Sequence, residues 1–305
     1  MNDLLAIADL SAPQLQQLLQ LAGTIKNNPK AYQQALQGKS IALLFEKPSL
    51  RTRASFAAGI NRLGGHSIYL DAASLIGERE SAADVGANLA CWHDAIVARV
   101  FSQQTLTELA EAADKPVINA LSDLCHPCQA LADLLTLEEN LGPLAQLNVV
   151  WIGDGNNVCH ALMGAAALAG MTLQIATPDG YAPDPELLAA AQQQAAAHGG
   201  SISVVHSLAQ LQPCDAIYTD TWFSMGQQRD ANQVMQDFAP FQVNTALMQQ
   251  LSAKAFLHCL PAQRGREVTA NVLDGEQSLV LKQAENRLHA QNAILVTLLG
   301  ANADD

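Results

Sequence analysis

A cluster of hydroxyl and guanidinium side chains around residue 50 could bind an anion. The cluster comprises Ser49, Arg51, Thr52 and Arg53. Residues 40–45 before it form an apolar run typical of a buried strand, and residues 54–63 after it have the spacing of a helix that stops at Gly64-Gly65. At a strand-to-helix turn, unpaired backbone N–H groups and the positive end of the helix dipole point at one place. The stretch therefore predicts a cradle for an anion.

The same stretch leaves room for two other interpretations. It lacks the G-x-x-x-x-G-K-[ST] pattern of a nucleotide-binding P-loop, so a small phosphorylated ligand fits it better than a nucleoside triphosphate. A surface turn with two solvated arginines is also compatible with these residue types. Motifs elsewhere in the chain are needed to distinguish a ligand-binding turn from a solvated one.

Two further polar groups follow apolar runs. Arg99 ends the run 95–99, where a lone arginine is more often a solvated loop residue than a ligand contact. Cys125-His126-Pro127-Cys128-Gln129 contains C-x-x-C, a redox or zinc signal. No second Cys or His pair lies at zinc spacing and a thioredoxin context is absent, so both of these interpretations are weak.

The second half of the chain carries a Gly-rich turn and a polar loop. Gly153-Asp154-Gly155-Asn156-Asn157 follows an apolar run, and Asp179 lies downstream where a dinucleotide-binding fold places its ribose-binding acid. The third glycine of that fingerprint is replaced by Val158. The loop 219–226 carries Asp220, Ser224 and Met225 and ends at Gly226; by itself it could be only a turn.

Short apolar runs alternate with helical stretches along the whole chain, which predicts an α/β fold with two open parallel-sheet domains and helices on both faces. The predicted strands are 40–45, 67–70, 95–100, 116–119, 148–152, 172–176, 201–205, 216–219 and 255–257. The predicted helices are 11–22, 54–63, 81–92, 105–113, 127–141, 158–169, 185–197 and 281–299. Ligands of such sheets bind beyond the carboxyl ends of the strands, which is where the polar groups fall.

Composition bounds the class of protein. The chain has 305 residues, of which 49% are hydrophobic, enough for two domains. It has no run of about 18 apolar residues, and its N-terminus does not resemble a signal or transit peptide, so we expect a cytoplasmic protein. Six scattered cysteines do not suggest a disulfide framework.

Charge is distributed unevenly. The net charge of −13 argues against nucleic acid or an anionic membrane as a partner. Ten of the sixteen basic residues lie in 1–115, and none lies between Pro116 and Gln228. This pattern suits an anion in the first domain and an amine in the second, although a plain acidic surface explains the middle segment equally well.

Five motifs, taken in order, resemble those of the aspartate/ornithine carbamoyltransferase family. S-L-R-T-R at 49–53 is similar to the carbamoyl-phosphate signature S-x-R-T-R, and 126–133 is similar to H-P-x-Q-x-L-A-D. Residues 153–157 are similar to G-D-x-N-N. D-T-W-F-S-M-G at 220–226 and H-C-L-P at 258–261, together with F-E-K before the first motif, favour the ornithine branch.

The resemblance implies a role for each matching residue. Carbamoyl phosphate would be bound by Ser49, Leu50, Arg51, Thr52, Arg99, His126, Gln129, Cys259, Leu260 and Arg287. Ornithine would be bound by Asn157, Asp220, Ser224 and Met225. Arg99, His126, Asp220 and Cys259 would act in the chemistry, while Arg53 would mainly organise the turn. Residues 1–135, joined by the C-terminal helix in 281–305, would form the carbamoyl-phosphate domain, and 136–280 the ornithine domain.

The implied reaction transfers a carbamoyl group from carbamoyl phosphate to the side-chain amine of ornithine, giving citrulline and phosphate within arginine metabolism. It needs no metal or organic cofactor, and the family is built on a homotrimer. An NAD-dependent oxidoreductase and a non-catalytic amino-acid or phosphate-binding paralogue are the alternatives. Four positions depart from the usual family residues, namely Leu50, Leu75, Glu78 and Gln263.

Overall fold

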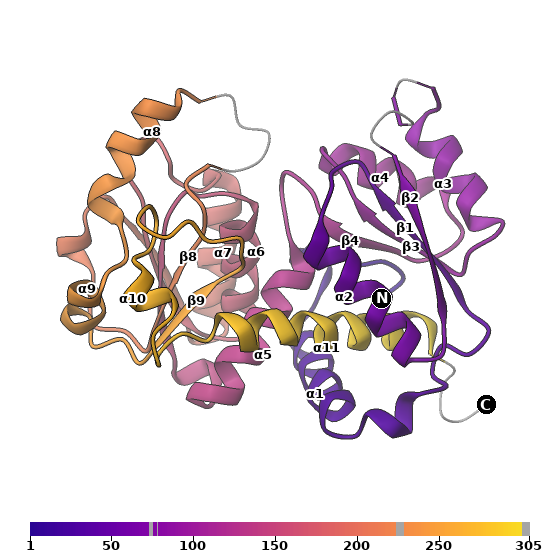
Figure 1. Ribbon diagram of the computed structural model, residues 1–305, viewed down its shortest axis with the longest axis horizontal. Helices are drawn as coiled ribbons and strands as arrows, with labels where there is room; N and C mark the ends of the chain where they lie inside the picture. Colours follow the sequence, from indigo (N-terminus) through magenta and orange to yellow (C-terminus); the bar gives the residue numbers. More distant parts are fainter. Residues whose placement is uncertain (73–75, 78, 224–228, 301–305) are drawn as a thin grey trace. The chain divides into compact units, whose positions relative to one another are not determined.

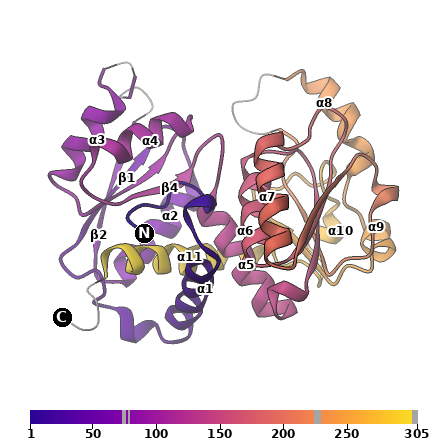
Figure 2. The same cartoon turned by 180° about the vertical axis from the view of Figure 1, so that it is seen from behind.

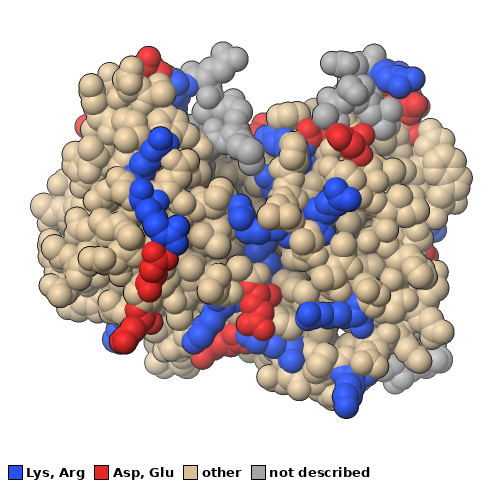
Figure 3. Space-filling model, viewed as in Figure 1, with Lys and Arg blue, Asp and Glu red and all other residues tan. Residues whose placement is uncertain are grey.

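The computed structural model describes residues 1–72, 76–77, 79–223 and 229–300. The chain divides into two compact units: unit 1 is Met1–Leu135 with Asn286–Asp305, and unit 2 is Thr136–Glu285. Within the ranges described, every helix is too short or too polar to span a lipid bilayer. The face of the molecule drawn in Figure 3 is mostly neutral, with Lys, Arg, Asp and Glu scattered over it.

Unit 1 is built on a four-stranded parallel sheet in the order β2-β1-β3-β4. Its strands are β1 (Ser40–Phe45), β2 (His66–Asp71), β3 (Ala95–Arg99) and β4 (Val117–Leu121). The central strands β1 and β3 are buried along almost their whole length, as expected of strands covered on both faces. The register pairs Phe45 with Arg99, so the carboxyl ends of these two strands are level.

Helices cover both faces of this sheet (Figures 1 and 2). They are α1 (Ala12–Asn27), α2 (Leu50–Arg62), α3 (Ala82–Ala90), α4 (Gln103–Ala112) and the parts of α5 (Pro127–Leu141) and α11 (Val280–Leu299) that belong to unit 1, with short 3₁₀ turns η1 (Ile7–Asp9) and η2 (Pro29–Tyr32). Side chains of α3 and α4, among them Leu89 and Leu106, form one core with β1 and β3. The predicted α/β class and its parallel sheet are therefore confirmed.

Helix α2 begins at Leu50, four residues before the predicted start. Ser49 has an extended backbone and its hydroxyl accepts a hydrogen bond from the Thr52 N–H, which makes it the N-cap. The prediction was wrong because Arg51, Thr52 and Arg53 were taken as turn residues. They form the first turn of the helix, where the free N–H groups and the dipole are strongest.

The C-terminal helix α11 is largely buried in unit 1 between Asn286 and Leu295. The Lys26 ammonium of α1 donates to the Asn286 side chain at 2.8 Å. A Cβ on Gly59 of α2 would lie 2.1 Å from the Asn292 side-chain oxygen, so a glycine is required for this approach. Figures 1 and 2 both show α11 beside α1.

Unit 2 is built on a five-stranded parallel sheet in the order β7-β6-β5-β8-β9. Its strands are β5 (Asn148–Ile152), β6 (Thr172–Ala176), β7 (Ser201–Val205), β8 (Ala216–Thr219) and β9 (Ala255–His258). The reversal of strand order beside β5 leaves its carboxyl end next to that of β8, a position where doubly wound sheets bind ligands.

Helices also cover both faces of the second sheet (Figure 1). Those within unit 2 are α6 (Asn157–Leu168), α7 (Pro185–Ala197), α8 (Ala231–Phe238), α9 (Thr245–Gln250) and α10 (Ala270–Leu273), with η3 (Leu144–Gln146), η4 (Leu208–Gln210) and η5 (Ala239–Phe241). Phe238 and Met248 pack with Ile217 and Phe256 in one core. Helices α8, α9 and α10 were not predicted, because each has eight residues or fewer, too short for a clear helical period.

Candidate active site

The predicted site residues follow the carboxyl ends of six strands. Ser49 follows β1, Arg99 ends β3, His126 follows β4, Asn157 follows β5, Asp220 follows β8 and Cys259 follows β9. The first three lie in unit 1 and the last three in unit 2. Each unit therefore carries its own group of polar side chains at the ligand-binding edge of its sheet.

In unit 1, the predicted anion cradle lies at the start of α2. The Ser49 hydroxyl accepts from the Thr52 N–H at 3.3 Å, which leaves its own proton available for a ligand oxygen. Arg51 is half-buried beside it, and Leu50 is 81% exposed. The guanidinium of Arg53 lies 3.7 Å from the centre of the Tyr69 ring, which agrees with a role in organising the turn.

Arg287 of α11 joins three segments of unit 1 that are far apart in sequence. One of its terminal nitrogens donates to the Thr52 hydroxyl oxygen at 2.7 Å. The other donates to the side-chain oxygen of Gln129 at 2.9 Å. All three side chains are at least 95% buried. Because the guanidinium is fixed by two acceptors, it presents a positioned positive charge beside the cradle.

His126 is a neutral imidazole within this positive surrounding. Burial lowers its pKa well below the ordinary value, and the charges of Arg287 and Arg99 lower it further. Its Nδ1 is buried and makes no hydrogen bond to the described residues. A neutral imidazole can donate one hydrogen bond to a carbonyl oxygen without competing for the phosphate charge.

Two unit 1 residues that the sequence analysis did not assign, Glu46 and Lys47, lie near Arg99: the Glu46 N–H donates to the Arg99 carbonyl at 2.9 Å. The Lys47 ammonium lies 4.4 Å from the centre of the Phe101 ring, and burial followed by the Arg99 charge lowers the pKa of Lys47. The Glu46 carboxylate accepts from the Phe101 N–H at 2.6 Å. The sequence analysis used Phe45-Glu46-Lys47 only as a motif of the ornithine branch of the family. The lowered pKa of Lys47 reflects its burial first and the nearby Arg99 charge second.

In unit 2, the Asp220 carboxylate is 7% exposed and accepts hydrogen bonds on both oxygens. Its Oδ1 accepts from the Thr221 N–H at 2.7 Å and from the Cys259 thiol at 3.1 Å. Its Oδ2 accepts from the Asn156 amide at 3.0 Å. The structure thus brings the predicted pair Asp220 and Cys259 together, and it fixes the carboxylate in one orientation.

Asn156, which was not assigned, links Asp220 to the Gly-rich turn. Its side-chain oxygen accepts from the N–H groups of Val158 and Cys159 at 3.0 and 3.1 Å, so Asn156 is the N-cap of α6 and Asn157 is the first helical residue. These are the N–H groups that a pyrophosphate would need. The dinucleotide interpretation fails because the Asn156 side chain already occupies them.

Arg229 contributes a further charge to this part of unit 2. Its guanidinium donates to the buried Asp154 carboxylate at 3.1 Å and lies 4.3 Å from the centre of the Tyr181 ring. The Tyr181 carbonyl accepts from the Gly155 N–H at 2.8 Å. The ion pair therefore braces the turn that carries Asn156.

The H-C-L-P segment is fixed by hydrogen bonds of His258. Its Nδ1 accepts from the Leu260 N–H at 2.9 Å, so Nε2 carries the proton and donates to Glu267 at 3.3 Å. Leu260 has a positive φ of 60°, a strained value for a leucine. Ligand atoms of Asp220, His258 and Cys259 lie within 4.8 Å of one another, but both His258 nitrogens are engaged, so this imidazole has no lone pair for a metal ion.

The C-x-x-C interpretation also loses its support. Burial raises the pKa of the Cys125 and Cys128 thiols to about 12, and the Cys128 thiol donates to the Asn119 carbonyl at 3.3 Å. Thiols in this state are inert structural groups. Four other positions singled out from the sequence, Leu75, Glu78, Ser224 and Met225, lie outside the described residues.

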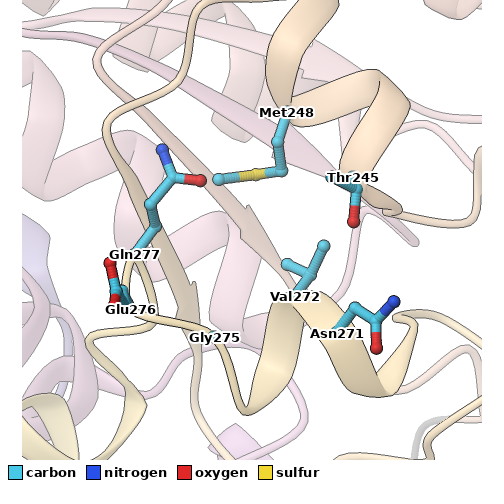
Figure 4. A pocket seen from close by; sticks show the side chains of 7 residues that line it. All are labelled: Thr245, Met248, Asn271, Val272, Gly275, Glu276 and Gln277. Carbon is cyan, nitrogen blue, oxygen red and sulfur yellow. The ribbon is translucent and has the colours of Figure 1, made fainter.

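A cavity of about 310 Å³ opens elsewhere in unit 2 (Figure 4). It is lined by Thr245, Met248, Asn271, Val272, Gly275, Glu276 and Gln277. None of these residues belongs to the motifs described above, and the cavity plays no part in the site.

Comparison with known proteins gives one consistent result. The aspartate/ornithine carbamoyltransferase family matches with its carbamoyl-P binding domain at residues 2–139 and with its Asp/Orn binding domain at residues 145–298. The chain is 53% identical over 299 residues to the ornithine carbamoyltransferase of Shewanella oneidensis, covering 98% of this chain and 99% of that protein.

Solved structures agree. The ornithine carbamoyltransferase from Pyrococcus furiosus superimposes with a TM-score of 0.94 at 44% identity, covering 99% of this chain and 98% of that one. The anabolic ornithine carbamoyltransferase from Campylobacter jejuni does so with a TM-score of 0.91 at 34% identity, covering 98% of this chain and 99% of that one.

Proposed function

The chain belongs to the aspartate/ornithine carbamoyltransferase family, and from this premise we propose that it transfers the carbamoyl group of carbamoyl phosphate to the side-chain amine of L-ornithine, giving L-citrulline and phosphate. We assign carbamoyl phosphate to residues 1–135 with the C-terminal helix, and ornithine to residues 136–280. The relatives and solved structures described above, all ornithine carbamoyltransferases, support this choice of substrate.

The observation that carries the choice of ornithine is the environment of Asp220. Its carboxylate is held by Asn156, Thr221 and Cys259, all of them uncharged donors. An ammonium group would complete the charge balance of such a buried carboxylate, whereas the second carboxylate of aspartate would oppose it. The segment from Pro116 to Gln228 contains no Lys or Arg, and Arg229 just beyond it is paired with Asp154.

Carbamoyl phosphate needs fixed positive charge at its phosphate and donors at its carbonyl. Ser49, Arg51 and the N–H groups at the start of α2 would hold the phosphate, with the exposed Leu50 contributing its backbone. Thr52, Arg99 and His126 would donate to the carbonyl oxygen, which gains negative charge as the amine attacks. One such preorganised donor is typically worth about 3 kcal/mol in the transition state.

The amine of ornithine attacks only in its neutral form. With a pKa of ~10.4, about one molecule in a thousand is neutral at pH 7.4, a penalty of about 4 kcal/mol. Asp220 and Cys259 would bind and orient ornithine, with Asn157 at its α-carboxylate. The departing phosphate is a base strong enough to take the proton that the amine loses, so this proton transfer needs no further base.

The test is carbamoyl transfer from carbamoyl phosphate, followed as the amine-dependent release of phosphate, with four amines: ornithine, which gives citrulline, and aspartate, putrescine and N-acetylornithine, which give other carbamoyl products. Ornithine should be used at least about 10⁴-fold better than putrescine, which leaves the carboxylate-binding groups unpaired. Comparable turnover of aspartate and ornithine would refute the assignment of Asp220. Saturable binding of both substrates without citrulline would indicate the non-catalytic paralogue, and binding of NAD the oxidoreductase.

Three finer features are also proposed. The family is built on a trimer, so sedimentation should give a particle of three 32.4 kDa chains. The likeness to the anabolic Campylobacter jejuni enzyme supports the citrulline-forming direction, in arginine biosynthesis. We also propose a cytoplasmic location, and fractionation of cells that produce the protein tests it.

A further inference from the structure

The anion half-site in unit 1 ends in a buried carboxylate to which no role has yet been given. Asp133 lies four residues after Gln129, one turn along α5, and both side chains are completely buried. The Gln129 amide nitrogen donates to Asp133 Oδ1 at 2.8 Å. With the two hydrogen bonds of Arg287, this forms a continuous series from Asp133 through Gln129 and Arg287 to Thr52.

The chemistry of its two charged members gives this series one direction. A carboxylate only accepts hydrogen bonds and a guanidinium only donates them. The Gln129 amide lies between them, so its NH₂ must face Asp133 and its oxygen must face Arg287. No flipped arrangement of the amide satisfies both neighbours.

The far end of the series reaches the proposed chemistry. Arg287 donates to the Thr52 oxygen at 2.7 Å, so the Thr52 hydroxyl proton points away from the guanidinium. A hydroxyl that accepts from a cation is a stronger donor, because bonds in a series polarise one another. Thr52 is also the residue whose N–H is capped by Ser49, which fixes its backbone.

We propose that Asp133 is a positioning residue: through Gln129 it holds the Arg287 guanidinium in place, and so aims the Thr52 hydroxyl at the carbonyl oxygen of carbamoyl phosphate. The proposal rests on the proposed function for its substrate. Asp133 touches neither substrate. Its contribution should therefore appear in the rate of carbamoyl transfer rather than in the binding of phosphate, which Ser49, Arg51 and the helix N-terminus hold independently.

Two variants of nearly the same shape separate the hydrogen bond from the fold. Asp133→Leu removes the acceptor for Gln129, while Asp133→Asn keeps an acceptor and removes only the charge. For Asp133→Leu we expect kcat to fall about 10²-fold, the loss of one preorganised donor. The Kd of inorganic phosphate, measured by calorimetry, should change less than about threefold. For Asp133→Asn, kcat should fall less than about fivefold.

The matched control is Asp94→Asn in the same unit. Asp94 accepts from the Ser40 N–H at 2.9 Å and pairs with Lys39 at 3.1 Å, at the amino end of β1, away from the cradle. The substitution removes a carboxylate that has one backbone partner and one side-chain partner. It should lower the melting temperature without changing kcat.

Each outcome decides the matter. An Asp133→Leu enzyme with kcat within threefold of the parent would overturn the proposal, as would a phosphate Kd that rises in step with the loss of kcat, because that pattern indicates a structural role. If Asp133→Leu does not fold, Asp133→Ser, whose shorter side chain cannot reach Gln129, takes its place. An Asp133→Asn enzyme as impaired as the Leu or Ser variant would also refute it. Failure of the parent itself to form citrulline would instead refute the proposed function.

Discussion

Replacing Asp220 with asparagine changes one atom of the ornithine half-site and tests its geometry directly. The asparagine must present its NH₂ either to the Asn156 amide nitrogen or to the Thr221 N–H and the Cys259 thiol, all of which are donors. Asn156 cannot turn over to relieve the conflict, because its oxygen caps α6. In either orientation the NH₂ of Asn at position 220 therefore faces at least one donor, Asn156 on one side or Thr221 and Cys259 on the other.

The magnitude follows from two losses. A buried donor left without an acceptor costs about 1–3 kcal/mol. Removing the carboxylate partner of a bound ammonium costs a further 2 kcal/mol or more, on the order of the values measured for truncated charge pairs. The sum of about 3 kcal/mol or more corresponds to a fall of ~10²-fold or more in kcat/KM for ornithine.

The assay is steady-state citrulline formation with ornithine varied at saturating carbamoyl phosphate, together with calorimetric binding of inorganic phosphate. Phosphate binding should be unchanged, since Asp220 belongs to unit 2. The control is Asp215→Asn, which removes a carboxylate that accepts from the Asn148 N–H and pairs with Lys254. An Asp220→Asn enzyme with kcat/KM for ornithine within threefold of the parent would refute the reasoning.

Four further changes test other parts of the structure. Gly155→Ala would place a Cβ 2.2 Å from the Pro183 backbone nitrogen, so the turn must shift and the KM for ornithine should rise at least about tenfold. Gly23→Ala, which has open space around its Cβ, should leave this KM unchanged. Arg229→Ala removes the partner of buried Asp154 and should raise the KM for ornithine about tenfold, ~1.4 kcal/mol, while Lys254→Ala should not. Burial, then the charges of Arg287 and Arg99, lowers the pKa of His126, so below about pH 6.5 the unfolded chain binds a proton that the folded chain does not. The free energy of unfolding should therefore decrease as the pH is lowered below this value, by up to ~1.4 kcal/mol per pH unit. In urea unfolding, His126→Gln should show a weaker pH dependence there than the parent, and equal slopes would contradict the lowered pKa. Of the six thiols, only exposed Cys91 and half-buried Cys259 should react with a thiol reagent in the folded protein. Burial raises the pKa of the other four thiols, to about 12 for Cys125, Cys128 and Cys214. Fast labelling of a third thiol would contradict this prediction.

The sheet framework could be predicted from the sequence because parallel strands buried on both faces are continuous apolar runs. Residues 148–152, 172–176 and 201–205 were predicted with the bounds that the structure gives. The first residue of a helix was harder to predict, because it depends on which single side chain caps the helix. At 49–53 and at 156–157 several residues could serve as caps, and only the folded backbone selects Ser49 and Asn156.

The partners of the site residues could not be predicted at all. Arg287 was placed in the site only by resemblance, and its contacts with Thr52 and Gln129 join positions separated by 235 and 158 residues. Periodicity describes the face of one element, and it carries no information about which element packs on that face. The same limit hid Arg229, which pairs with Asp154 across 75 residues.

The discontinuity of unit 1 has a consequence for biosynthesis. A ribosome completes Met1–Leu135 and must then translate all of Thr136–Glu285 before Arg287 emerges. At about 5–20 residues per second, this interval lasts roughly ten to thirty seconds. During that time Gln129 and Thr52 lack the guanidinium that joins them, and Gly59 lacks the helix that packs on it. The nascent N-terminal segment should therefore stay susceptible to proteases and available to chaperones until α11 has been synthesised.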